Sequence, residues 1–214
     1  MKVKFLLTGE GTSDLRLVDH LQAVLIEEGF SEVSGEAPDL AMFPAPVGRS
    51  VPEKIGALIK HYPTTDIIFV HRDSDNVDIA VREKEIHDAA IAVGVENRVV
   101  PIIPICMIET WLLTDPQAIK IVAGRKSYQQ NIHCMPAIRN LESVRDSKTL
   151  LLSALCEASG AEGGKLRKFK RLFPEMRARL MYDLDPQGPV NGLPSYQIFR
   201  KRVREFAKQR VEEA

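Results

Sequence analysis

Nearly continuous apolar runs alternate with amphipathic stretches along the first half of the chain. The runs over residues 3–7, 66–70 and 99–105 have the length and composition of strands that are buried on both faces of a parallel sheet. A further strand is predicted over residues 40–43, although nearby prolines interrupt its pattern. The pattern therefore predicts four strands with helices between them.

The predicted helices begin at characteristic residues. Ser50, Pro52 and Glu53 mark the start of a helix that runs toward His61, since serine and glutamate can cap each other's backbone. Further helices are predicted over residues 14–28, 77–92, 115–124, 147–158, 165–172, 174–184 and 195–212. Three apolar residues of the last helix are expected to face inward: Ile198, Val203 and Phe206.

This alternation predicts an α/β fold with a mostly parallel four-stranded sheet flanked by helices. Because Pro101 and Pro104 cannot donate ladder hydrogen bonds, their strand is expected at an edge of the sheet. The α/β domain is expected over residues 1–120, and a basic helical extension packed on it over residues 121–214.

The charges balance overall but are unevenly distributed. Residues 1–150 contain 16 Lys and Arg against 21 Asp and Glu, whereas residues 151–214 contain 13 against 8. An acidic part beside a basic part is what an enzyme acting on a polyanion requires. Arg72, Lys168, Arg171 and Arg202 are candidate contacts to nucleic acid, and the alternative is that such cations merely solvate helix faces.

The composition also favours a cytoplasmic protein. The three cysteines, at positions 106, 134 and 156, lie outside any paired motif and are expected to be reduced, mostly buried thiols. His133 and Cys134 have no second pair of ligands nearby, which disfavours a zinc site. No secretory signal or membrane-spanning segment is expected, and the Gly-rich stretch 159–164 is interpreted as a flexible joint that lacks the motif of a phosphate-binding loop.

Acidic residues follow three of the predicted strands. Glu10 lies between two glycines after the first run, Asp73 and Asp75 follow the run 66–70, and Glu109 follows the run 99–105. Ligands bind outside the carboxyl ends of the strands in open parallel sheets, and a D-x-D pair in extended conformation points both carboxylates the same way. Oxygen ligands of this kind suit Mg²⁺ or Mn²⁺, so the sequence predicts a metal site at this edge.

Each acidic motif also has a purely structural interpretation. Thr12 and Ser13 can cap the helix that follows the first motif, with Asp14 stabilising its dipole. Asp75 can cap the helix after the D-x-D pair. Glu109 can be a first-turn helix acid, and Trp111 with the neighbouring leucines is most simply core.

Taken together, these motifs resemble the TOPRIM domain. The resemblance rests on Gly9-Glu10-Gly11 after the first strand, the D-x-D pair after the third and the topology between them. The stretch Glu109-Thr110-Trp111-Leu112-Leu113-Thr114-Asp115 resembles a segment of a compact bacterial branch of unknown function, related to the overcoming-lysogenization-defect (OLD) nucleases and often found beside ATPases in phage defence. Asn76 stands where many TOPRIM domains have a glycine.

The resemblance implies roles for particular residues. Asp73, Asp75 and Glu109 would hold one or two Mg²⁺ ions, and Glu10 would complete the site or act as general base. Lys148 and Lys165, with Arg72 behind them, are the candidate catalytic cations that would stabilise the developing phosphate charge.

Three functions are consistent with these features. The first is a Mg²⁺-dependent nuclease acting on DNA or RNA, alone or with an ATPase partner in phage defence. The second is a non-catalytic TOPRIM-like module that binds nucleic acid or an ATPase and regulates it. The third is a metal-dependent phosphatase acting on a small phosphorylated substrate.

Overall fold

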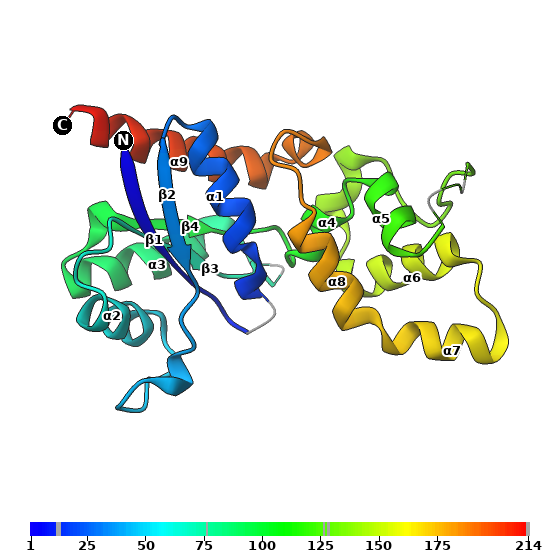
Figure 1. Ribbon diagram of the computed structural model, residues 1–214, viewed down its shortest axis with the longest axis horizontal. Coiled ribbons are helices and arrows are strands. Elements are labelled where there is room, and N and C mark those ends of the chain that lie inside the picture. The colour runs from blue at the N-terminus through cyan, green and yellow to red at the C-terminus, as the bar shows by residue number, and fades with distance from the viewer. Residues whose placement is uncertain (12–13, 76, 126, 128, 213–214) are drawn as a thin grey trace. The chain divides into compact units, whose positions relative to one another are not determined.

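The computed structural model describes residues 1–11, 14–75, 77–125, 127 and 129–212, which form two compact units (Figure 1). The sheet unit comprises Met1–Ile103 and Ile198–Ala214, and the helical unit comprises Pro104–Gln197. The division at Ile103 differs from the predicted boundary at residue 120, because the helices within residues 109–122 contact the helices that follow them along the chain.

The sheet has four parallel strands, as the sequence predicts. They are β1 (Lys2–Thr8), β2 (Glu32–Glu36), β3 (Ile67–His71) and β4 (Val99–Ile102), in the order β2-β1-β3-β4. The strand with Pro101 lies at an edge, which confirms the expectation from its missing donor. The chain moves outward from β1 to β2 and then continues on the opposite side with β3, so the order reverses between β1 and β3.

The prediction of a strand over residues 40–43 is wrong. That segment forms a short 3-10 turn, Leu40–Met42, which Asp39 caps by accepting a hydrogen bond from the Ala41 amide at 3.0 Å. The second strand is β2, whose sequence EVSGE contains no apolar run. An edge strand with few buried side chains needs none, so its sequence lacks the pattern that identified β1 and β3.

Helices cover both faces of the sheet (Figure 1). On one face, α2 (Val51–His61) and α3 (Ile79–Val93) pack against apolar side chains of the strands, including Leu6, Ile68 and Val70. The predicted start of α2 is confirmed, since the Glu53 carboxylate accepts the Ser50 amide hydrogen bond at 3.1 Å. The hydrogen bonds from Ser50 also lower the pKa of Glu53.

The other face carries α1 (Val18–Glu27) and the C-terminal part of α9 (Pro194–Glu212). A 3-10 turn, Asp14–Leu17, precedes α1. Phe199 packs against Phe69 with ring centroids 6.2 Å apart, and Phe206 stacks on Phe30. Val203 and Phe206 are buried as predicted, but Ile198 is 38% exposed and Phe199 takes the inward position instead.

The helical unit contains α4 (Glu109–Leu112), α5 (Pro116–Val122), α6 (Ser147–Ser159), α7 (Gly163–Arg171) and α8 (Phe173–Tyr182). Its core is built around Trp111, whose indole N–H donates to the Ser195 hydroxyl at 3.0 Å and whose ring meets Tyr196 edge-on. The predicted joint over residues 159–164 is shorter than expected, because its last two glycines belong to α7. In the described part of the chain, no helix is both long and apolar enough to cross a membrane.

Gly35 of β2 provides a test of the sheet packing. It pairs with Phe5 of β1, and a Cβ atom at Gly35 would collide with the buried Phe5 ring. We expect Gly35→Ala to lower the free energy of unfolding by about 1 to 3 kcal/mol, the usual cost of overpacking. Urea unfolding measures this change in free energy, and Gly56→Ala in α2 is the control. A Cβ atom at Gly56 would have no atom within 4 Å outside its own helix backbone. Alanine there should therefore raise the free energy of unfolding by about 0.5 to 1 kcal/mol.

Candidate functional site

The structure places two of the predicted acids at the point where the strand order reverses. Glu10 lies two residues beyond β1, and Asp73 lies two residues beyond β3. These strands are neighbours, with Thr8 opposite Val70 near their carboxyl ends. In open α/β sheets this switch point is where ligands bind. The sequence therefore predicted correctly that Glu10 and Asp73 follow the carboxyl ends of neighbouring strands.

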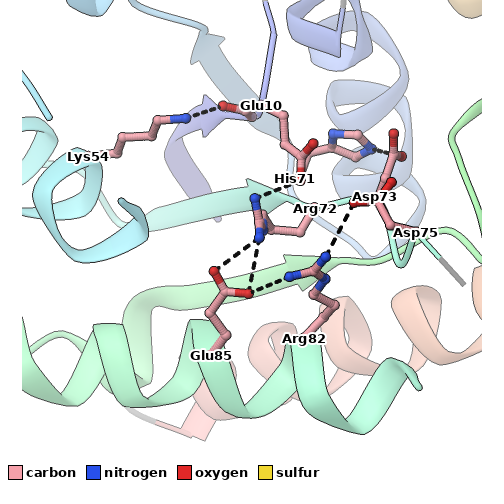
Figure 2. A network of polar contacts seen from close by, with 9 residues as sticks. Glu10, Lys54, His71, Arg72, Asp73, Asp75, Arg82 and Glu85 are labelled. Carbon is pink, nitrogen blue, oxygen red and sulfur yellow. Dashed lines mark hydrogen bonds and ion pairs between the residues drawn. The ribbon is translucent and has the colours of Figure 1, made fainter. Parts of the chain in front are cut away.

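A chain of alternating charges connects Glu10 to Asp75 (Figure 2). Arg72 contacts Glu10 through Nη1 at 2.7 Å and Glu85 through Nη2 at 3.1 Å. Arg82 contacts the same Glu85 at 3.1 Å and Asp75 at 3.2 Å. Arg72 was a predicted nucleic-acid contact, and the structure instead places its guanidinium between two acids of its own unit.

The D-x-D pair does not have the extended geometry that was predicted. β3 ends at His71, and Asp75 has a φ of 51°, the left-handed conformation that aspartate tolerates better than most residues. The chain therefore turns within the motif. Asp73 lies 3.4 Å from the buried His71 imidazole. The alternative interpretation of Asp75 as a helix cap is also wrong, since Asp78 caps α3 by accepting the Ala80 amide at 2.8 Å.

The electrostatic surroundings raise the pKa of Glu10. Partial burial is the largest cause, because it disfavours the charged carboxylate. Arg72 opposes it, the nearby charges of Asp73 and Asp75 raise the pKa further, and His71 has a smaller lowering effect. Glu10 therefore retains its proton to a higher pH than an ordinary glutamate does.

The acids suit a divalent cation by ligand type. Carboxylate oxygens are the preferred ligands of Mg²⁺, and the repulsion that Asp73 and Asp75 exert on Glu10 is the kind that a cation relieves. Among the residues that the structure describes, no group of three His, Cys, Asp or Glu side chains is arranged to hold a metal ion. Arg72 and Arg82 supply positive charge instead. Asp73, which lies 3.4 Å from His71, and Asp75, which contacts Arg82, are the candidate ligands for such an ion, and Glu10 contacts Arg72.

A cavity of about 870 Å³ opens beside Glu10 within the sheet unit. Its lining comes from residues 9–11, from much of the segment 38–49, and from Lys54 and Arg72. Lys54 donates to the Gly9 carbonyl at 2.7 Å and so holds the turn after β1 (Figure 2). The sequence analysis missed Arg49 and Lys54, because it assigned the neighbouring segment to a strand and gave no reason for cations beside it.

Glu109 has a different environment from the other acids. It begins α4 in the helical unit, is 2% exposed, and accepts a hydrogen bond from Arg177 Nε at 2.7 Å. The other polar residues of its segment are also engaged locally: Thr110 and Thr114 donate to main-chain carbonyls, and Asp115 caps α5. The motif that most resembled a catalytic segment thus builds the core of the helical unit.

The other predicted cations fall into two groups. Exposed side chains of the helical unit are Lys148 on α6 and Lys165, Lys168 and Arg171 on α7. Arg202 belongs to the sheet unit, where its guanidinium contacts Glu83 and donates to the Pro101 carbonyl at 3.3 Å. The predicted capping residues Thr12 and Ser13, and Asn76 beside the D-x-D pair, lie outside the described residues.

The cysteines are free, as predicted, but only Cys106 is buried. The Glu157 carboxylate accepts the main-chain amides of His133 and Cys134. Partial desolvation of its sulfur, with a smaller contribution from the hydrogen bond to Glu157, raises the pKa of Cys134 to about 11.

A scan against protein-family models and searches of curated proteins and of solved structures found no match to this chain. The resemblance to the TOPRIM domain therefore rests on the motifs in the sequence alone.

Proposed function

We propose that this protein is a Mg²⁺-dependent phosphodiesterase that acts on nucleic acid, in the manner of TOPRIM nucleases. The observation that carries the proposal is the position of Glu10 and Asp73 on either side of the sheet's switch point. Glu10 also lines a cavity together with cationic side chains. The proposed site consists of Glu10, Asp73 and Asp75. It does not include Glu109, whose carboxylate is neutralised by Arg177.

In this mechanism Asp73 and Asp75 would hold the ion, which would neutralise phosphate charge and make water a better nucleophile. The Glu10 carboxylate accepts a proton from the attacking water, and its raised pKa makes it a stronger base. Arg72 orients that carboxylate. A phosphorus–oxygen bond forms to the water oxygen, the bond to the leaving oxygen breaks, and the leaving oxygen takes a proton from solvent.

Cations outside the site would bring the polyanion to it. Lys148, Lys165, Lys168 and Arg171 are exposed on the helical unit, and such side chains attract a phosphate backbone without reading its sequence. Arg49 and Lys54, which line the cavity, replace the lysines of the helical unit as the proposed phosphate contacts next to Glu10.

Glu10→Gln tests the proposed proton acceptor. Glutamine cannot accept the proton, so we expect cleavage of a mixed DNA and RNA panel in Mg²⁺ to fall by about 10²- to 10⁴-fold. The fold should survive, because burial already disfavours the charged form of Glu10. Glu32→Gln on β2, which removes an exposed carboxylate, is the control. Full cleavage by Glu10→Gln would exclude Glu10 as the base.

The pH dependence of cleavage follows from the same residue. Only the ionised carboxylate accepts a proton, so the rate should rise with pH through a Glu10 pKa above that of an ordinary glutamate. Arg72 lowers this pKa, so Arg72→Ala should move the acid limb of the rate profile to higher pH. Lys60→Ala should leave the limb in place, and an unshifted limb in Arg72→Ala contradicts the assignment.

One observation favours a second function. Arg72 and Arg82 already neutralise Glu10, Glu85 and Asp75, as expected for a network that holds loops together without a metal. A non-catalytic module that binds nucleic acid or an ATPase would have this arrangement. This second function predicts that the binding of nucleic acid or of an ATPase survives in Glu10→Gln and weakens when the exposed cations of α7 are neutralised.

A further inference from the structure

The lining of the cavity beside Glu10 combines two chemistries, which we name its cationic wall and its apolar wall. The cationic wall is the set Arg49, Lys54 and Arg72, and the apolar wall is the set of apolar lining residues between β2 and α2, among them Leu40, Phe43, Pro44 and Val47. Its volume of about 870 Å³ lies within the range of small-molecule sites. Neither the metal ligands nor the proton transfer proposed above requires the apolar wall.

The cationic wall is suited to a phosphate. Arg49 is exposed and its guanidinium makes no hydrogen bond or ion pair with any residue that the structure describes. Of the two acids in the lining, Glu10 contacts Arg72, and Asp39 accepts the Ala41 amide. Arg49 therefore provides the guanidinium that remains available for a phosphate group.

The apolar wall is suited to a flat ring. Phe43 is half-buried, and its ring lies 4.4 Å from the His61 imidazole, which supports it from within the same unit. Leu40 and Phe43 also pack against the core beneath α2 and α3. A supported aromatic ring beside proline and aliphatic side chains provides a platform on which a nucleobase stacks.

We propose that this cavity binds a nucleoside 5′-phosphate, with the base against Phe43 and the phosphate at Arg49. The nucleotide comes either as a free mononucleotide or as the phosphorylated end of a single strand, and the second source rests on the proposed nuclease function. A sugar phosphate lacks the flat apolar face, and an apolar ligand lacks the anion. A nucleotide satisfies both walls at once and brings its phosphate next to Glu10.

Calorimetry on the full chain tests this with thymidine 5′-monophosphate, ribose 5-phosphate and inorganic phosphate, in EDTA and in Mg²⁺. We expect thymidine 5′-monophosphate to bind about five- to a hundred-fold more tightly than ribose 5-phosphate, because the stacking of one base on an aromatic ring contributes a difference of this size. In Phe43→Ala the two affinities should become equal. Arg49→Ala should weaken both organic phosphates by about ten- to a hundred-fold and leave the ratio intact.

Matched controls come from the same region. Met42 lies beside Phe43, is 80% exposed and does not line the cavity, so Met42→Ala should change nothing. Lys60 lies on α2 with Lys54 and also does not line it, so Lys60→Ala controls for charge. Because Phe43 contacts the core, Phe43→Leu is the second variant: it keeps the apolar packing and should still lose most of the ratio.

The outcomes separate this inference from the proposed function. Equal affinity for thymidine 5′-monophosphate and ribose 5-phosphate, or an unchanged ratio in folded Phe43→Leu and Phe43→Ala, overturns the nucleotide site even if Mg²⁺-dependent cleavage is found. Selective nucleotide binding without cleavage supports the site while the nuclease proposal fails. A 5′-phosphorylated oligothymidylate that binds with the same Phe43 dependence identifies a strand end as the source, and binding of the monophosphate alone identifies a free nucleotide.

Discussion

Glu109→Ala is expected to lower the free energy of unfolding by about 3 to 5 kcal/mol, the cost of removing one partner of a buried ion pair. The Glu109 side chain is 3% exposed and Arg177, its partner at 2.7 Å, is 10% exposed. Alanine would leave the guanidinium charge buried without its carboxylate. Urea unfolding followed by tryptophan fluorescence measures the loss locally, because the single tryptophan, Trp111, lies in the same short helix.

Two controls isolate the pair. Arg177→Ala should be about as destabilising as Glu109→Ala, and the double variant should cost less than the two single changes together, since neither charge is then left alone. Asp183→Ala removes the partner of Arg179, an exposed residue on the same helix as Arg177, and should cost no more than about 0.5 kcal/mol.

The same variant decides between two roles for Glu109. The TOPRIM resemblance makes it a metal ligand, and the structure makes it a structural partner of Arg177. If Glu109→Ala leaves the stability unchanged and removes Mg²⁺ binding, Glu109 is a metal ligand. A large loss of stability with metal binding retained in the folded fraction supports the structural role.

Asp73→Asn is expected to reduce Mg²⁺-dependent cleavage by at least about 100-fold, because metal stabilisation of a phosphate transition state contributes several kcal/mol. Asparagine has nearly the same shape but lacks the charge. It also removes one of the charges that raise the pKa of Glu10, so residual activity should have its acid limb at lower pH. Initial cleavage rates over a pH series measure both effects.

Asp75→Asn makes a useful comparison. Asn tolerates the left-handed conformation of residue 75 as Asp does, so the swap changes charge without backbone strain. Asp75 is half exposed and contacts Arg82, so its loss should reduce cleavage less than that of Asp73. Asp88→Asn, which removes an exposed partner of Lys84 on α3, should leave cleavage unchanged.

The fold was predictable where side chains are buried on both faces. All five residues of β3 are buried, and the apolar run over residues 66–70 predicted both ends of this strand to within one residue. β2 is an edge strand with alternating partly exposed residues, so EVSGE carried no such signal. In the segment 40–43, Leu40, Ala41 and Phe43 line a cavity, and Leu40 and Phe43 also cover the core. Hydrophobicity alone does not distinguish such a loop from a strand.

The site was predictable only as far as strand ends define it. Glu10 and Asp73 follow directly from the carboxyl ends of β1 and β3. Other members of the charge network come from elsewhere: Arg82 and Glu85, which pair with Asp75 and Arg72, belong to α3, where the sequence suggests ordinary solvated charges. The role of Glu109 depends on Arg177, 68 residues later, and no local pattern indicates such a pair.

Titration of Mg²⁺ and Mn²⁺ into the purified protein, followed by calorimetry, tests the central claim most directly. The claim is that Asp73 and Asp75 hold a divalent cation at the switch point of the sheet. It predicts saturable binding to the wild type that is lost in Asp73→Asn/Asp75→Asn and retained in Asp88→Asn. Equal binding by the double variant, or no binding by the wild type with or without a bound oligonucleotide, would contradict it.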